Sequence, residues 1–311
     1  MPPSATPAPT PASLARQQGR GFALGLLGVV IFAMTLPMTR LAVGDAAAPQ
    51  LAPAFVTAGR AAVAGLLSVA YLLAVRAPWP ARVHWWPLAV SALGTVLGFP
   101  LFIALALRAV DAMHAAVVTG VLPLATAVVA ALALRQRPSK GFWACALLGC
   151  ALVLAFAAWQ GGGRLSGADG WLLLAVLSAA IGYVGGAQVA AVLPAQQVIC
   201  WVLVGSLPFT LPLALWLLPT EPVRGTAWLG FAYASVFSMW LGFFAWYRGL
   251  ALGGVVRVSQ VQLLQPFLAL IFAVPVLGET LEPLTLGFSL AVIAVVFAGR
   301  RMPVARPAKE L

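Results

Sequence analysis

The sequence predicts an all-α integral membrane protein, with ten transmembrane helices arranged as two inverted five-helix repeats around a central cavity. Three observations predict this fold class. Hydrophobic residues make up 62% of the 311 residues and charged residues only 8%, against about 45–50% and about 25% in soluble domains. The apolar residues gather in ten runs, each close to the roughly 20 residues that span a bilayer. Segments from the two halves of the chain also align with each other.

Each apolar run ends at charges, glycine, proline or a short polar stretch, and the joins between runs are short. Lipid offers no hydrogen-bond partner to the backbone, so runs of this length are predicted to be helices. The predicted spans cover residues 21–43, 51–75, 86–107, 113–134, 141–159, 170–192, 196–218, 226–247, 254–277 and 281–299. Short joins without a soluble domain indicate one compact bundle.

The spans divide the chain into four parts. Residues 1–20 have the proline-, alanine-, serine- and threonine-rich composition of a disordered tail. Residues 21–160 are predicted to form the first five-helix repeat, residues 169–300 the second, and residues 301–311 a C-terminal tail. The run after the first tail exceeds the roughly 7–15 residues of a signal-peptide core, so we interpret it as a span.

The net charge of +11, from 18 basic and 7 acidic residues, is distributed unevenly along the chain. If the N-terminus is cytoplasmic, twelve basic residues lie in inner loops and tails and three lie in outer loops. This positive-inside pattern predicts a protein of the cytoplasmic (inner) membrane with both termini in the cytoplasm. It explains the basic charge without a nucleic-acid partner, and no basic-aromatic cluster remains to bind one.

Two pairs of spans align without gaps. With Pro123 on Pro266, an offset of 143 residues, TGVLPLATAVVAALALRQRPS lies on QLLQPFLALIFAVPVLGETLE. The third and eighth spans align at an offset of 140, which places Arg108 on Arg248. Because five spans is an odd number, the two halves would have opposite orientations in the membrane. Inverted repeats are typical of secondary transporters, whose site lies near the midplane between the halves.

Four segments carry a family resemblance: GVVIFAMTLPMTRLAV, FVTAGRAAVAGLL, GVLPLATAVVAALALRQRPS and LLQPFLALIFAVPVLGETLEP. In their order and spacing they resemble the first, second, fourth and ninth helices of the drug/metabolite transporter superfamily, specifically its EamA-type exporters. The resemblance covers nearly the whole chain except both tails. One position departs from it, because Gln136 stands where the family usually has glutamate, whereas Glu279 keeps the glutamate in the second half.

Arg60 is the deepest charge in the predicted spans. It lies nine residues into the second span, about 13–14 Å deep at ~1.5 Å per residue, and no acidic residue lies in a predicted span interior. Intramembrane charges are costly and favour a functional role. Two interpretations stay open: Arg60 binds an anionic group of a solute in a water-filled cavity, or backbone carbonyls and polar neighbours hold it. Arg40, near an outer span end, is expected to reach the interface.

A polar face is predicted on the ninth span. Ser259, Gln262 and Gln265 have the spacing i, i+3, i+6, which places them on one side of a helix. Amide side chains are unfavourable in lipid, so this side is expected to point inward. The paired side of the fourth span offers Thr119 and Thr126. We expect Thr119, Ser259, Gln262 and Gln265 to bind the solute, with interhelical hydrogen bonding as the alternative.

Aromatic and proline residues complete the predicted site. Three aromatic residues inside spans are expected to form apolar cavity walls, with helix packing as the alternative: Tyr183, Tyr233 and Trp240. Three prolines remove helical hydrogen bonds and are candidate hinges for alternating access, although simple curvature explains them equally well: Pro37, Pro123 and Pro266.

The cysteines and histidines indicate no cofactor or metal. Cys145, Cys150 and Cys200 have no paired spacing, which argues against a metal site or a disulfide framework. His84 and His114 are interpreted as ordinary polar residues near an interface. The sequence also contains no ATP-binding P-loop motif, so primary active transport by this chain alone is not expected.

The resemblance implies an exporter of small metabolites such as amino acids. Without an acid in a span interior, we expect alternating access without an Asp/Glu proton relay. The expected partners are a small-molecule solute and the lipid bilayer, and the oligomeric state stays open, with a monomer compatible. The alternatives are a non-transporting receptor or assembly subunit, and a membrane enzyme acting on lipid-linked substrates. Enzymatic activity is not expected, because the few acidic residues are scattered rather than clustered.

Overall fold

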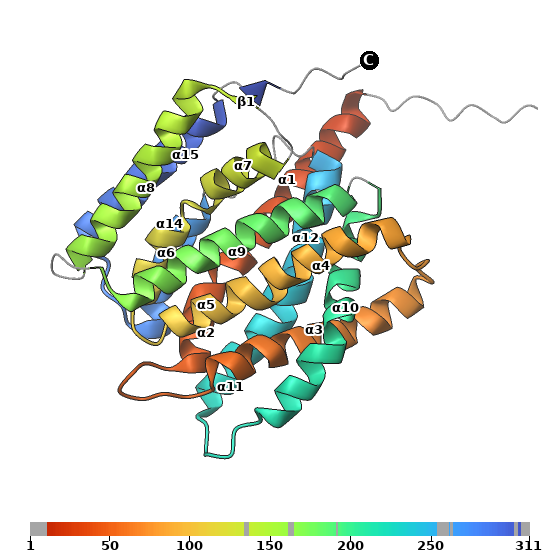
Figure 1. Ribbon diagram of the computed structural model, residues 1–311, viewed down its shortest axis with the longest axis horizontal. Coiled ribbons are helices and arrows are strands. Elements are labelled where there is room, and N and C mark those ends of the chain that lie inside the picture. Colours follow the sequence, from red (N-terminus) through yellow and green to blue (C-terminus); the bar gives the residue numbers. More distant parts are fainter. Residues whose placement is uncertain are drawn as a thin grey trace, which may run out of the picture.

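The computed structural model describes residues 11–133, 137–160, 165–190, 192–253, 261, 264–301 and 304–305. These residues form a bundle of helices (Figure 1). Within them, eight helical segments are long and apolar enough to cross a membrane. Two shorter apolar helices, Gln265–Leu277 and Pro283–Ala298, lie inside the ninth and tenth predicted spans.

The first half of the chain covers the first five predicted spans. Its elements are α1 (Pro11–Ala33), α2 (Thr35–Val43), α3 (Pro53–Ala74), η1 (Arg82–His84), α4 (Trp85–Ser91), η2 (Ala92–Gly98), α5 (Phe99–Ala106), α6 (Ala112–Thr119), α7 (Leu122–Ala133) and α8 (Lys140–Gln160). The first helix begins at Pro11 rather than at residue 21. Residues 11–20, which we expected to belong to a disordered tail, are therefore helical.

The second half covers the remaining spans. Its helices are α9 (Gly167–Ala190), α10 (Ala195–Trp216), α11 (Gly225–Ala232), η3 (Tyr233–Leu241), α12 (Gly242–Gly253), α14 (Gln265–Leu277) and α15 (Pro283–Arg301). Two short strands, which the all-α prediction did not include, pair antiparallel: β1 (Arg137–Pro138) and β2 (Val304–Ala305).

Helix breaks adjoin the three prolines that the sequence suggested as hinges. Pro37 lies in the first turn of α2, directly after the break between α1 and α2. Pro123 and Pro266 are the second residues of α7 and α14. The first turn is the position where a proline costs least, because its missing N–H would have no intrahelical acceptor there. Pro37 and Pro123 thus lie directly after short interruptions within longer helical segments, Arg16–Val43 and Ala112–Ala133.

Two π-helical segments lie at equivalent places in the two halves. The first, η2, covers residues 92–98 of the third span, and the second, η3, covers residues 233–241 of the eighth. Shifted by the sequence offset of 140, residues 92–98 fall on residues 232–238. Because π-helices are rare and mark functional or strained places, their coincidence supports the sequence alignment of these spans.

Glycines let several helices approach closely. The helix α9 packs along η2 and α5, and α1 packs along α12. A Cβ atom on Gly94 would lie 2.3 Å from the carbonyl oxygen of Ser178, and one on Gly249 would lie 2.6 Å from the backbone nitrogen of Gly25. Small residues at helix contacts are typical of membrane bundles, where van der Waals packing replaces the hydrophobic effect between helices.

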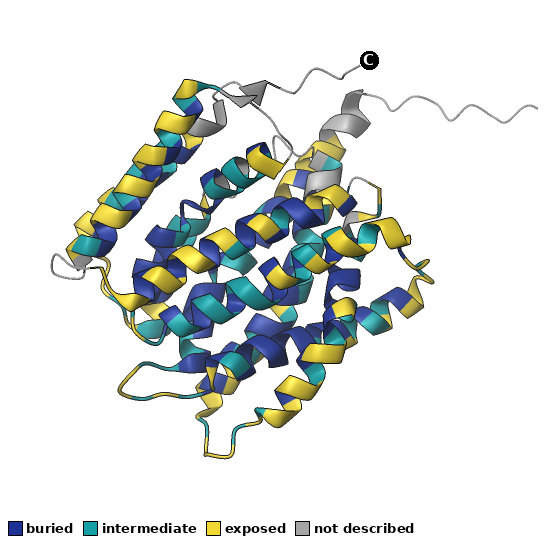
Figure 2. Cartoon of the chain, in the orientation of Figure 1, coloured by how far each residue is buried: buried dark blue, intermediate teal, exposed yellow. Residues whose placement is uncertain are grey.

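The outward faces of the bundle are apolar. Figure 2 shows buried residues concentrated between the central helices and exposed residues along the outer sides, including those of α8, which packs against α15. On α10, the side chains of Phe209 and Trp216 are 75% and 81% exposed. Large exposed apolar side chains along these outer sides suit a bundle surrounded by lipid tails rather than water.

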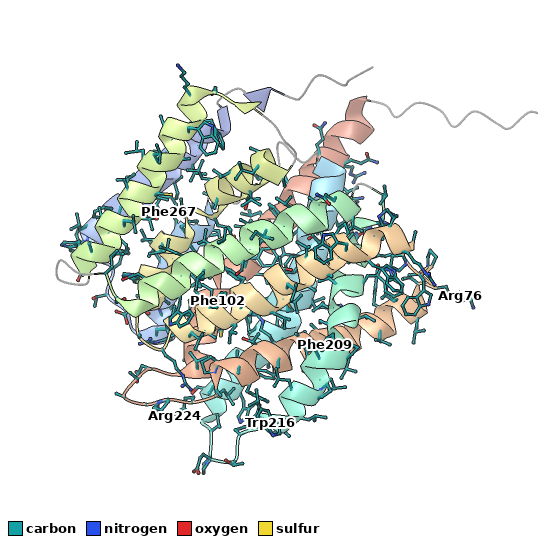
Figure 3. All side chains as sticks on the ribbon, in the orientation of Figure 1. Arg76, Phe102, Phe209, Trp216, Arg224 and Phe267 are labelled. Atoms are coloured by element: carbon teal, nitrogen blue, oxygen red, sulfur yellow. The ribbon has the colours of Figure 1, made fainter. Side chains whose placement is uncertain are left out.

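The connections gather at two ends of the bundle. Trp216 and Arg224 lie at one end, and Arg76 lies at the other (Figure 3). At the first end, the backbone nitrogen of Arg224 donates to Gln50 Oε1 at 3.0 Å. We call this end, with the loops 44–52, 107–111 and 218–224, the outer end, following the predicted orientation.

Candidate functional site

Arg60 is buried in the interior of the bundle. It is the eighth residue of the 22-residue helix α3 and is 3% exposed. Its Nη2 donates a hydrogen bond of 3.0 Å to Ser238 Oγ on η3, and Thr35 Oγ1 on α2 donates to the same oxygen at 2.8 Å. The Arg60 Nε has no hydrogen-bond partner. Among the described residues, no carboxylate lies within ion-pair distance of Arg60. The structure therefore leaves this charge with polar but neutral support.

A pocket lies beside the α1–α2 break, the α6–α7 break and the start of α14. Its volume is about 30 Å³, which is room for about two water molecules. It is lined by Ala33 and Leu36 beside the α1–α2 break, Ala116, Thr119, Gly120 and Leu122 beside the α6–α7 break, Gln265, Pro266 and Ala269 at the start of α14, and Ile293 on α15. Two of the predicted solute-binding residues, Thr119 and Gln265, are thus brought together here. Arg60, Thr35 and Ser238 are not among the residues that line this pocket.

The three aromatic residues of the predicted site lie in different surroundings. The Tyr233 hydroxyl donates to the carbonyl oxygen of Ile31 at 3.1 Å, near Thr35. Trp240 packs on Phe244, with ring centroids 4.8 Å apart, and its buried indole N–H has no partner. Tyr183, on α9, packs against the large apolar cluster that also contains the pocket-lining residues Leu36 and Ala116. None of the three lines the pocket at the helix breaks.

Several predicted residues fall outside what the structure describes. Ser259 and Gln262 are outside the described residues, as is Gln136. For Pro123 only the backbone is described. Pro37 is buried within α2.

The loop between the third and fourth spans is held from both sides. Arg40 Nη1 donates hydrogen bonds to the carbonyl oxygens of Leu107 and Val110, the second at 2.8 Å. The carboxylate of Glu279 accepts hydrogen bonds from the backbone N–H groups of Ala112 and Met113, at 2.7 and 2.8 Å. A cation thus meets the carbonyl end of one helix and an anion meets the amide end of the next, as the helix dipoles favour. The Arg40 side chain, which we expected to extend to the membrane interface, thus also binds the backbone of this loop.

A buried hydrogen-bonded pair of side chains was missed by the sequence analysis. His114 on α6 and Asp169 in the first turn of α9 are both buried, with Nε2 and Oδ1 2.7 Å apart. Our predicted span began at residue 170, one residue too late, and His114 was interpreted as an ordinary interface residue. Ser166 and Asp169 form reciprocal side-chain to backbone bonds. The S-x-x-D spacing of such a capping box was the available signal.

The same pair borders a second, larger pocket. This pocket has a volume of about 570 Å³ and lies at the outer end between α5, α8 and α9. His114, Asp169 and Asp111 are among the residues that line it. In the described residues, no group of three or more histidine, cysteine, aspartate or glutamate side chains is placed to hold a metal ion.

A bundle of apolar helices with lipid-facing sides, buried polar groups and helices broken inside the span is an integral membrane protein of the transporter class. The model of the EamA-like transporter family matches residues 19–158 and again residues 166–299. The chain belongs to this family, which is part of the drug/metabolite transporter superfamily.

Individual relatives agree with the family. The chain is 44% identical over 283 residues to the uncharacterized transporter YdeK of Bacillus subtilis, a match that covers 90% of this chain and 97% of that protein. It is 27% identical over 270 residues to the chloroplastic WAT1-related protein At3g02690 of Arabidopsis thaliana, covering 79% and 63%. A solved structure described only as a crystal structure of a protein superposes with a TM-score of 0.58 at 19% identity, covering 91% and 97%, and shows the fold alone.

Proposed function

We propose that this membrane transporter is a secondary transporter of the cytoplasmic membrane that exports a small metabolite, such as an amino acid. In this proposal the halves 21–160 and 169–300 have opposite membrane orientations, and both termini are cytoplasmic. Alternating access arises as the halves rock against each other around a shared site. The chain has no enzymatic activity in this account, and its partners are the solute and the bilayer.

Helix packing supports two related halves. The contact of the first helix with the eighth, α1 with α12, has a counterpart in the contact of the sixth with the third, α9 with α5. Exchanging the halves converts one contact into the other. The second helix packs on the seventh, α3 on α10, and the fifth on the tenth, α8 on α15, and these pairs map onto themselves. The double family match and the paired π-helical segments support the same relationship.

The observation that carries the proposal is the pocket beside the α1–α2 break, the α6–α7 break and the start of α14. A pocket of about 30 Å³ is too small for an amino acid, so a solute needs the helices around it to move. The breaks beside Pro37, Pro123 and Pro266 supply segments that can move as units. In our proposal these prolines mark the hinges, and Thr119, Gln265, Ser259 and Gln262 hydrogen-bond the solute.

Arg60 is proposed to bind the anionic group of the solute, such as a carboxylate. Its support in the structure is neutral, and its Nε has a free hydrogen to donate. A buried guanidinium prefers a carboxylate, which it can bind through two parallel hydrogen bonds. The hydroxyls of Tyr233 and Thr35 both lie within hydrogen-bond distance of the carbonyl oxygen of Ile31, so Tyr233 would complete the wall of the site on this side. In our proposal the solute contacts Trp240 and Tyr183 as the helices move.

Coupling is proposed to proceed without an Asp/Glu proton relay. The acidic residues other than Glu310 are Asp45, Asp111, Asp169, Glu221, Glu279 and Glu282. Each lies in an outer-end loop or, for Asp169, in the first turn of a helix that starts there. None sits at the depth of Arg60, so we propose uniport, solute exchange or coupling through a group other than a carboxylate.

Counterflow in proteoliposomes tests the proposal. A thermal-shift screen over amino acids and other small carboxylates first identifies a stabilising solute, since a ligand stabilises the state it binds. Radiolabelled solute should then accumulate against preloaded unlabelled solute, equally with and without a pH gradient. Strict dependence on the proton gradient would overturn the coupling proposal, and absence of counterflow for every stabilising solute would overturn transport.

A further inference from the structure

The short helix α6 connects the outer end to the pocket. Its first residue, Ala112, lies in the loop held by Arg40 and Glu279, and its last, Thr119, lines the pocket at the helix breaks. The eight residues of α6 span about 12 Å at ~1.5 Å per residue, so a displacement of its outer end also displaces its inner end. Whatever fixes the outer end of α6 therefore also fixes the position of Thr119.

Glu279 caps α6 from the other half of the chain. The residue before α6, Asp111, makes no side-chain capping hydrogen bond. Instead both carboxylate oxygens of Glu279, 166 and 167 residues away in the sequence, accept the first two backbone N–H groups of the helix. An anion at a helix N-terminus is favourable, and its loss leaves those N–H groups without an acceptor.

The capping arrangement is not symmetric. The residue that aligns with Glu279 in the first half is Gln136. Glutamine is neutral and offers only one acceptor oxygen, so it cannot repeat the two-oxygen cap. The charged cap therefore belongs to one end of the bundle.

A second contact joins α6 to the second half at the next residue, His114. The His114 ring bonds Asp169 Oδ1 at 2.7 Å, while Asp169 Oδ2 accepts from the backbone N–H and the hydroxyl of Ser166. Asp169 is thereby fixed in α9, and His114 is fixed to it. Two carboxylates of the second half hold a helix of the first half.

We propose that Glu279 and Asp169 are positioning residues that latch α6 to the second half and keep the pocket at Thr119 closed from the outer end. Outward opening separates Glu279 from the α6 amides. The inference rests on alternating access as proposed above, and it adds which contacts must break for the outer side to open.

Cysteine labelling from the two sides tests the latch without a known solute. Thr119→Cys is placed in a background in which the three native cysteines are replaced by alanine, and a membrane-impermeant thiol reagent is added to intact cells or to inverted vesicles. In the Glu279→Ala variant, labelling should become about tenfold faster from the outside and slower from the inside. Glu279→Gln, which keeps one acceptor, should lie between, and Asp169→Asn should shift labelling in the same direction.

Glu282→Gln is the matched control, because Glu282 is an exposed acid three residues further along the same loop. It should label like the unmodified reporter. A general loosening of the bundle would raise labelling from both sides, and that result, or equal rates in Glu279→Ala and Glu282→Gln, would overturn the latch.

Ala112→Pro removes one donor without touching the acid. Asp111 already has φ −71° and ψ 157°, the conformation that a following proline requires, and proline suits the first position of a helix. If Glu279→Ala fails to fold, this variant replaces it in the labelling experiment. It should also favour labelling from the outside. Unchanged labelling would overturn the latch. One-sided labelling without any transport would overturn the proposed function and leave the latch standing.

Discussion

Arg60 and Ser238 are joined by a hydrogen bond of 3.0 Å across 178 residues of sequence. The bond links α3 of the first half to η3 of the second, and Thr35 adds a further bond to the same Ser238 oxygen. The serine therefore holds the guanidinium in place while leaving its charge uncompensated. This combination of a fixed position and a free charge is what an anion-binding residue needs.

Replacing Arg60 should abolish transport of an anionic or zwitterionic solute. In Arg60→Ala we expect counterflow to fall at least tenfold with normal membrane insertion, because the charged partner of the solute is lost. Arg60→Lys should recover only part of the rate, since an ammonium cannot form two parallel bonds to a carboxylate.

Arg224→Ala is the matched control for this prediction. Arg224 is exposed in an outer-end loop, where its backbone N–H and its carbonyl oxygen make hydrogen bonds. Its loss should leave counterflow within twofold of wild type. Equal effects of the two replacements would show that Arg60 acts only through general charge or expression.

Replacing Thr119 and Thr126 in turn distinguishes a role in solute binding from a role in helix stability. Both hydroxyls donate to the carbonyl four residues earlier, at 2.7 and 2.8 Å, but only Thr119 lines the pocket. Thr119→Ala should raise the KM for the solute several-fold, whereas Thr126→Ala should not. Both should keep a similar thermal unfolding temperature, because the lost bonds are equivalent. A similar KM in both variants would remove Thr119 from the site.

The contact of η2 with α9 should not tolerate a methyl group. At Gly94 a Cβ would lie 2.6 Å from backbone atoms of Gly182, and backbone cannot move as a side-chain end does. We expect Gly94→Ala to lower the free energy of unfolding by about 1–3 kcal/mol, as overpacking does. Gly205→Ala, where nothing lies within 4 Å, should have little effect on thermal unfolding in detergent. Equal unfolding temperatures would contradict the close packing of these helices.

Glu279 should make stability depend on pH. Burial raises the pKa of the half-buried Glu279 carboxyl and nearby Asp111 adds to this, while the α6 amides and Arg40 oppose it. The folded protein then binds the proton more tightly than the unfolded chain. Stability from this residue is therefore present below the unfolded pKa and is lost as pH rises through the folded pKa.

The test compares thermal unfolding of wild type with Glu279→Gln between pH 4 and 8. The advantage of wild type over the variant should shrink as pH rises through this window, because glutamine does not titrate. The same comparison for Glu282→Gln should be flat. An advantage that grows with pH would mean that the amide bonds outweigh burial.

Local signals predicted the course of the chain well. The apolar runs indicated the spans, because backbone polar groups in lipid must be satisfied within a helix. The prolines marked the breaks at α2, α7 and α14, since a proline is tolerated where a helical segment begins. The π-helical segments had no signal that we could recognise, although they occur at aligned positions.

Long-range contacts were the part that sequence patterns could not supply. Arg60 was singled out by its depth, but its partner Ser238 lies in a segment with no charge to mark it. The Glu279 cap on α6 joins residues that no local pattern connects. Trp240 packs against Phe244, and this contact is compatible with both a cavity wall and helix packing, the two roles that the sequence left open. The predicted sixth span began at residue 170, so Asp169 was not recognised as part of the helix.

The account depends most directly on Arg60 and the solute it binds. The decisive measurement is counterflow of the stabilising solute in proteoliposomes that contain equal amounts of folded wild type or Arg60→Ala. We predict clear accumulation with wild type and at least a tenfold lower rate with Arg60→Ala, while Arg224→Ala matches wild type. Equal accumulation with wild type and Arg60→Ala would contradict the account.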